Sequence, residues 1–300
     1  MAEGSLPDPT AVMAALNRAA HLMLDPPPHV FVDDVVLRLV NVPAVLRCAG
    51  FDVPDEQGVR PDGWLFNPRA LEWFRGWRGT FVARARFVDE LVVEEVARGV
   101  NQLVLLGAGL DTLALRRTDL GGQLDVFEAD QPATQAWKVQ RIRELFGCVP
   151  SNLVFAPVDL ETAASWLDEL VAVGFDVERP ALVVSTGVTQ YITRSALAAT
   201  MRDVASLAEG TTFVCTFVLP FDLIPAAERQ LRTVTEERAV ERGAPWISFY
   251  QPEEVLAAAD AAGFVAVDHV SAAAWDDAWF RMRPDDLHPA AGEHAIVARL

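Results

Sequence analysis

Two glycines and two carboxylates in the middle of the chain have a spacing that suits nucleotide binding. Gly107 and Gly109 directly follow an apolar run, residues 102–106, which predicts a buried strand and then a tight turn. Glycine lets such a turn approach a ligand closely. Glu128 and Asp130 end the next apolar run, where a nucleotide-binding sheet holds a ribose by its hydroxyls. Either half alone is also an ordinary feature of α/β proteins, so the prediction depends on the combination.

Thr112 decides which nucleotide the turn fits better. A nicotinamide site needs a third glycine three residues after the second, so that the helix can pack close under the pyrophosphate, and that position is Thr112. S-adenosylmethionine has no phosphate and presents an amino-acid end to the turn. The pattern therefore favours S-adenosylmethionine, and a nicotinamide oxidoreductase is the alternative.

The elements that position these residues alternate regularly between strand and helix. Apolar runs predict strands, and apolar residues at helical spacing predict the helices between them. Such alternation implies a parallel sheet with helices on both faces and ligands at the carboxyl ends of the strands. The predicted strands are residues 102–106, 124–130, 153–158, 181–185 and 211–219, and the predicted helices are residues 84–98, 112–117, 131–145, 162–173 and 195–207.

The segment before residue 84 is predicted to be a helical cap, with helices from Pro9 to Met23 and from Val32 to Cys48 and a loop over residues 50–63. A dense aromatic cluster follows. Its density favours core packing, with the wall of a substrate pocket as the other interpretation. The cluster consists of Trp64, Phe66, Trp73, Phe74, Trp77 and Phe81.

The chain after residue 219 adds a charged helix from Pro225 to Arg242, which we interpret as part of a lid insertion over residues 220–250. A helix over residues 252–262 and strands over 264–270 and 294–300 follow. We expect the two strands to be joined by a loop without a helix and to form an antiparallel edge pair. The loop holds Trp275, Trp279 and Phe280. The predicted organisation is a cap over residues 1–83 and a cofactor-binding α/β domain over residues 84–300, together one unit.

Five segments in order resemble the motifs of the leucine carboxyl methyltransferase-like family of S-adenosylmethionine-dependent methyltransferases, including its actinobacterial branch and polyketide carboxyl O-methyltransferases. The similarity is specific from about Arg84 to Thr216. It implies a class I methyltransferase sheet, Rossmann-like, mostly parallel and with an antiparallel C-terminal strand. The segments are residues 84–89 (RARFVD), 105–112 (LLGAGLDT), 127–132 (FEADQP) with Lys138, 158–160 (VDL) and 185–191 (STGVTQY).

The resemblance also implies roles for individual residues. Arg84 contacts the carboxylate of the cofactor's methionyl group, since a guanidinium can donate two parallel hydrogen bonds to a carboxylate. Asp130 holds the ribose with Glu128 as support, while Asp159 and Leu160 contact the adenine. The turn contributes Gly107, Ala108, Gly109 and Asp111.

Two positions depart from the family pattern. Leu113 stands where the family has arginine, and Thr186 stands where the fourth strand usually ends in a glutamate beside the cofactor's amino end. Thr186 and Tyr191 are therefore the candidate catalytic, positioning residues. We predict an O-methyltransferase acting on a carboxylate or hydroxyl of a small apolar secondary metabolite. A hydroxyl acceptor needs a base, for which Tyr191 and His269 are candidates. The alternative is a family member that has lost methyl transfer or catalyses another reaction, such as a cyclisation.

Composition excludes several other classes. A formal net charge of −17 disfavours nucleic acid and anionic membranes as partners. The five histidines lack ligand spacing, so no metal site is predicted. The three cysteines, Cys48, Cys148 and Cys215, are interpreted as reduced core thiols.

No N-terminal signal pattern or membrane-spanning run is present, so we expect a cytoplasmic protein with a small-molecule substrate. The sequence makes no prediction about oligomeric state.

Overall fold

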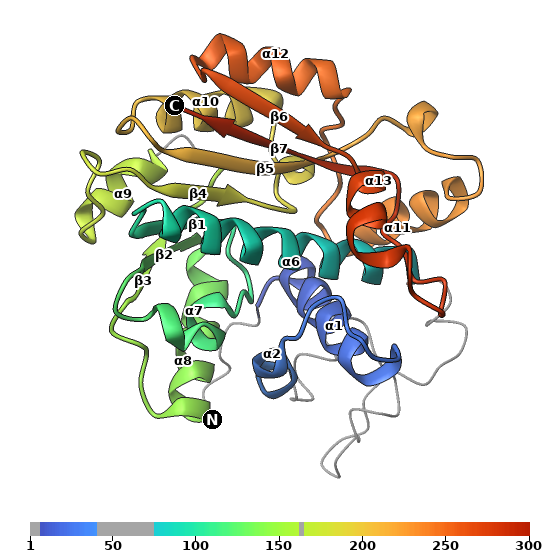
Figure 1. Ribbon diagram of the computed structural model, residues 1–300, viewed down its shortest axis with the longest axis horizontal. Coiled ribbons are helices and arrows are strands. Elements are labelled where there is room, and N and C mark those ends of the chain that lie inside the picture. The colour runs from blue at the N-terminus through green and yellow to red at the C-terminus, as the bar shows by residue number, and fades with distance from the viewer. Residues whose placement is uncertain (1–6, 41–74, 162–164) are drawn as a thin grey trace.

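A mixed sheet forms the centre of the molecule in the computed structural model, which describes residues 7–40, 75–161 and 165–300 (Figure 1). In these residues seven strands follow the order β3-β2-β1-β4-β5-β7-β6. The first five are parallel, and β7 runs antiparallel between β5 and β6. This order confirms the predicted class I methyltransferase fold. The strands are β1 (Gln102–Leu106), β2 (Asp125–Asp130), β3 (Leu153–Pro157), β4 (Leu182–Ser185), β5 (Thr212–Val218), β6 (Ala266–Val270) and β7 (Glu293–Arg299).

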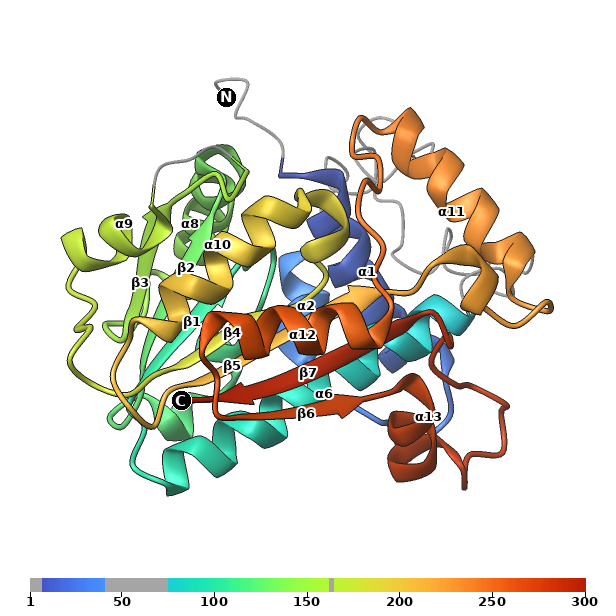
Figure 2. The same cartoon turned by 90° about the horizontal axis from the view of Figure 1, so that it is seen from above.

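Helices cover both faces of the sheet, because successive strand side chains point to opposite faces. Leu103 and Leu105 of β1 pack on one side, and Val104 and Leu106 pack on the other. Figure 2 shows the sheet between the two helical layers. The first layer is α6 (Arg75–Ala97), α7 (Leu113–Arg116) and α8 (Pro132–Phe146), and the second is α9 (Trp166–Ala172), α10 (Arg194–Ala205) and α12 (Pro252–Ala262).

Helix α6 begins nine residues earlier than the predicted start at Arg84. Its first turns pack between the cap and α11 (Arg229–Glu241), which is the predicted charged helix. Trp77 explains the extension, since its Nε1 donates to Thr235 Oγ1 at 2.9 Å and its ring meets that of Trp246 edge to face. The residues that contact the first turns of α6 are far away in sequence, so the local sequence pattern could not predict this part of the helix.

The cap lies on the glycine turn at the carboxyl ends of the strands. Helices α1 (Pro9–Leu24) and α2 (Asp34–Leu39) bury Leu110 of that turn in their own core. Arg18 donates to Leu110 O at 2.7 Å and to Asp33 Oδ2 at 3.0 Å. Thr112 Oγ1 donates to the same Asp33 oxygen at 2.7 Å, so the residue in place of a third glycine fastens the turn to the cap.

A buried polar cluster joins α1 to α6. Arg78 donates from Nε and Nη2 to Asp25 at 2.7 and 2.6 Å, and His21 Nδ1 lies 2.7 Å from the same carboxylate. Burial lowers the pKa of His21, and its Nε2 accepts from Val30 N at 3.0 Å. The neutral ring therefore donates at one nitrogen and accepts at the other, which fixes the cap against α6.

The connection between β6 and β7 contains helix, and our prediction of a plain loop was wrong. It consists of α13 (Ala272–Trp275) and a π-helical turn, η4 (Asp276–Phe280). Trp275 and Phe280 are buried against Val82 and Ala83 of α6, and burial of these aromatic side chains stabilises the helical turns. The antiparallel pairing of β6 with β7 is as predicted.

The second cap helix is shorter than the predicted Val32 to Cys48, since α2 ends at Leu39. Other predictions fall outside the described residues, namely the loop over residues 50–63, Cys48, and the four cluster aromatics Trp64, Phe66, Trp73 and Phe74. Of the described thiols, Cys215 is buried in β5, where burial raises its pKa to about 12, but Cys148 is exposed, contrary to the prediction of a core thiol. No helix in the described residues is long and apolar enough to span a membrane.

Candidate active site

A cavity of about 990 Å³ opens at the carboxyl ends of β1 and β4. It is at the upper end of the size range for small-molecule sites, large enough for a nucleotide-sized ligand and a second molecule. The sheet supplies its floor, and the cap, α6 and α11 supply its walls. Of the residues predicted to bind the cofactor, Glu128 alone does not line this cavity. Those that do are Arg84, Gly107, Ala108, Gly109, Asp111, Asp130, Asp159, Leu160, Thr186 and Tyr191.

Both glycines of the turn are required by the packing of the protein itself. Gly107 and Gly109 have φ angles of +69° and +51°, which favour glycine. A Cβ at Gly109 would lie 2.9 Å from that of Ala11 in the cap, and one at Gly107 would collide with Val188 Cγ2. The sequence analysis expected glycine here because a ligand must approach the turn closely. The structure adds a second reason for glycine, since side chains of the cap and of the loop after β4 leave no room for a Cβ.

Asp130 holds the turn and still has acceptor capacity. Its Oδ2 accepts from Gly109 N at 2.5 Å and its Oδ1 from Gln131 N at 2.7 Å. Burial raises its pKa, and those two backbone donors oppose the shift. A carboxylate offers about four lone-pair positions, so about two remain beside these two backbone donors.

Glu128 lies deeper in β2, away from the cavity. Its Oε2 accepts from Lys138 Nζ of α8 at 2.6 Å, and both side chains are almost fully buried. Burial raises the pKa of Glu128 to about 7 even beside this ammonium group. Glu128 could therefore support Asp130 only indirectly, through the position of β2.

Asp111, Asp159 and Leu160 lie on the cavity wall. Asp111 Oδ1 accepts at 2.7 Å from the backbone N of Leu113, the first residue of the short helix α7. Asp159 Oδ1 accepts from Glu161 N at 3.0 Å, which shapes the loop after β3. Both carboxylates thus hold backbone turns at the ends of parallel strands.

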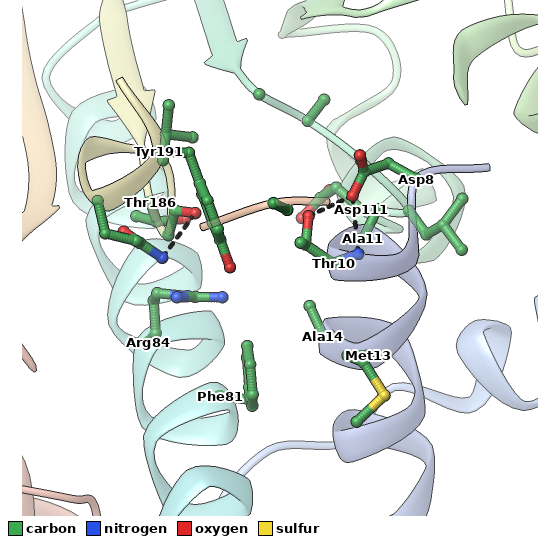
Figure 3. Close-up of a pocket in the computed structure, with 18 of the residues that line it drawn as sticks. Asp8, Thr10, Ala11, Met13, Ala14, Phe81, Arg84, Asp111, Thr186 and Tyr191 are labelled. Carbon is green, nitrogen blue, oxygen red and sulfur yellow. Dashed lines mark hydrogen bonds between the residues drawn. The ribbon is translucent and has the colours of Figure 1, made fainter. Parts of the chain in front are cut away.

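Arg84, Thr186 and Tyr191 meet on one side of the cavity (Figure 3). Arg84 projects from α6, with its guanidinium 4.8 Å from the centre of the Phe81 ring, and Nη1 donates to Glu293 Oε1 at 2.9 Å. Burial raises the pKa of Tyr191, whose ring meets the edge of Trp246. His269, the other candidate base, does not line the cavity and lies against His294.

Several wall residues were missed by the sequence analysis. Glu293 begins β7, Asp8 begins α1, and Trp246 follows α11. Asp8 could have been found, because an aspartate directly before a proline and an apolar run is a helix-start signal. Of the aromatic cluster, Trp77 and Phe81 line the cavity. For these two, the pocket-wall interpretation therefore applies.

Comparison with known proteins agrees with this geometry. Residues 11–205 match the family described as leucine carboxyl methyltransferase. The chain belongs to that family. Family membership confirms the resemblance seen in the sequence and makes the protein an S-adenosylmethionine-dependent methyltransferase.

Individual relatives are about 30% identical to this chain over the segments that align. YktD of Bacillus subtilis, provisionally named an S-adenosyl-L-methionine-dependent methyltransferase, is 29% identical over 222 residues, or 73% of this chain and 72% of YktD. A protein of Frankia alni with the same kind of name is 34% identical over 188 residues, 61% of this chain. The match spans only 55% of that relative's length.

Solved structures show the same fold at low sequence identity. A DUF574 family protein from Streptomyces avermitilis has a TM-score of 0.54 and 17% identity, covering 76% of this chain and 87% of its own. A protein from Thermobifida fusca, provisionally titled a methyltransferase, has a TM-score of 0.52 and 20% identity, covering 77% and 87%. At this identity the likeness concerns the fold alone.

Proposed function

We propose that the protein is an O-methyltransferase that methylates a carboxylate or hydroxyl of a small, mostly apolar molecule. The observation that carries the proposal is the two-part cavity. At the strand ends it carries the carboxylates of Asp111, Asp130 and Asp159, and between the cap and α11 it is lined by apolar and aromatic side chains together with Arg238 and Arg242. The apolar part includes Met13, Ala14, Trp77, Leu231 and Trp246.

The polar part fits the cofactor that the family uses. Asp130 has two acceptor positions for the ribose, and Arg84 presents a charged donor to a carboxylate. Asp159 and Leu160 are suited to the adenine, the first as an acceptor for the amino group and the second as an apolar surface. The bound cofactor supplies an electrophilic methyl group on a sulfonium. The protein's part is to align the acceptor with it in a site without bulk water.

A carboxylate acceptor fits this cavity better than a hydroxyl. A hydroxyl must lose a proton to a base, whereas a carboxylate is already ionised at neutral pH. Every described carboxylate on the cavity wall accepts a hydrogen bond from the protein, and a hydrogen bond to the ionised form opposes proton uptake. Burial raises the pKa of Tyr191. The engaged carboxylates are Asp8, Asp33, Asp89, Asp111, Asp130, Asp159, Glu161 and Glu293.

Thr186 favours a second candidate function, that of a family member which has lost methyl transfer or catalyses another reaction such as a cyclisation. Its hydroxyl cannot supply the charge of a carboxylate at this position. The same experiment separates the two functions.

The test uses purified protein, S-adenosylmethionine with a labelled methyl group, and matched pairs of apolar carboxylic acids and phenols of equal size. We expect release of S-adenosylhomocysteine and formation of labelled methyl esters that alkali hydrolyses, with the acid preferred over the phenol. Label on carbon, or on the phenol alone, contradicts carboxyl methylation. Cofactor binding with chemical change of a substrate but no transfer of label supports the second candidate.

A further inference from the structure

A buried carboxylate from β7 reaches the cavity wall beside Arg84. Glu293 begins β7 and pairs with Val218 at the carboxyl end of β5, so it lies at the edge of the sheet where the cavity opens. The residue is 3% exposed. A buried charge is costly unless it is paired, and the partner of this carboxylate is the guanidinium of Arg84, at 2.9 Å.

The position of Arg84 is fixed from three sides. The Phe81 ring lies under its guanidinium, and Glu293 accepts from Nη1. On a third side the backbone of Gly187 is so close that a Cβ there would lie 2.5 Å from Nη1. The remaining donors of the guanidinium are therefore held in one orientation at the cavity wall.

A fixed cation beside a fixed anion complements a zwitterion. An α-amino acid group carries a carboxylate and an ammonium on neighbouring atoms. Arg84 can donate to the first, and Glu293 can accept from the second, because one carboxylate bonded to one N–H retains acceptor capacity. Nearby, Thr186 offers only a neutral hydroxyl. Asp111 and Asp130 accept from backbone N–H groups of their own turns, whereas Glu293 is bonded to Arg84 itself.

We propose that Glu293 is a specificity-determining residue that binds the ammonium of the cofactor's amino-acid group while it positions Arg84 for the carboxylate. This inference rests on the proposed function, since it concerns the amino-acid end of S-adenosylmethionine. The charge needed beside the ammonium is then supplied by β7 at the far end of the chain rather than by the residue that follows β4.

The test compares two ligands by calorimetry in the wild type, Glu293→Gln and a control. S-adenosylhomocysteine carries the amino-acid group, and 5′-methylthioadenosine lacks it. Glutamine keeps an acceptor for Arg84 and removes the charge. We expect Glu293→Gln to weaken S-adenosylhomocysteine about tenfold to hundredfold, the range of one charge-assisted hydrogen bond, and to leave 5′-methylthioadenosine within about twofold.

Glu95→Gln is the matched control. Glu95 is also a buried glutamate, bonded to Arg98 and Thr212 at 3.0 Å, but it lies outside the cavity. The Glu95→Gln variant should have a lower melting temperature but unchanged affinities for S-adenosylhomocysteine and 5′-methylthioadenosine. Equal weakening of both ligands in Glu293→Gln, or no weakening, overturns the assignment to the ammonium.

A wild-type measurement keeps the test independent of folding of the variant. An S-adenosylhomocysteine analogue with hydrogen in place of the amino group should bind wild type about tenfold or more weakly than the parent ligand. Equal affinity for the two overturns the proposal. Wild-type protein that binds neither S-adenosylhomocysteine nor 5′-methylthioadenosine overturns the proposed function as well, so the two failures are distinguishable.

Discussion

Replacing Asp130 by alanine should weaken the cofactor by removing two acceptor positions at once. Two of the carboxylate's lone pairs are used by Gly109 N and Gln131 N, and about two remain for ribose hydroxyls. One hydrogen bond to a charged group contributes about 1.5–3 kcal/mol. The two ribose hydrogen bonds share one carboxylate charge, so we expect Asp130→Ala to lose about 2–3 kcal/mol of binding free energy in total. This corresponds to a Kd that rises roughly 30-fold to 150-fold.

The same change also frees the buried turn, and the assay must separate this effect from loss of the ribose. Calorimetry with S-adenosylhomocysteine and its 2′,3′-dideoxy analogue does so. In the wild type the parent ligand should bind more tightly, and in Asp130→Ala the two should bind alike. Asp125→Ala is the control, because Asp125 is exposed at the opposite end of the same strand and should change neither affinity.

The result that would refute this reasoning is an unchanged preference for the parent ligand in Asp130→Ala. The carboxylate would then act only on the shape of the turn. The melting temperature of Asp130→Ala, compared with that of the wild type, shows how far the fold is destabilised when Gly109 N loses its acceptor.

Three further predictions concern Arg84, Thr186 and Glu128. Arg84→Lys keeps the charge but loses the planar fork, so affinity for S-adenosylmethionine should fall about tenfold or more; wild-type affinity would mean that the guanidinium geometry is not used. Thr186→Glu should leave cofactor affinity equal or tighter but abolish turnover by filling the acceptor side of the cavity, and full activity would contradict this. Burial raises the pKa of Glu128 from 4.5 to about 7, so between these values the folded protein keeps a proton that the unfolded chain loses, and stability falls as pH rises. Urea unfolding should show the wild type losing up to about 3 kcal/mol more than Glu128→Gln between pH 4.5 and 7, and parallel curves would show that the shift is absent.

The sequence alone determined the elements whose signals are local. Strand β1 occupies the predicted residues, Gln102–Leu106, and helix α12 the predicted Pro252–Ala262. An apolar run that ends in glycine, and a proline at the first turn of a helix, act within a few residues and do not depend on the rest of the chain. The mostly parallel sheet with an antiparallel last strand followed from the family resemblance.

Only the tertiary structure decided how the candidate site is completed. Period-two alternation puts Glu128 and Asp130 on one face of β2, but only Asp130 reaches the strand end where the cavity opens, and Lys138 binds the deeper carboxylate. Glu293 lies beside Arg84 although 209 residues separate them in sequence, because β7 inserts next to β5. Contacts of this kind leave no periodic or local pattern, since chain folding alone brings the two residues together.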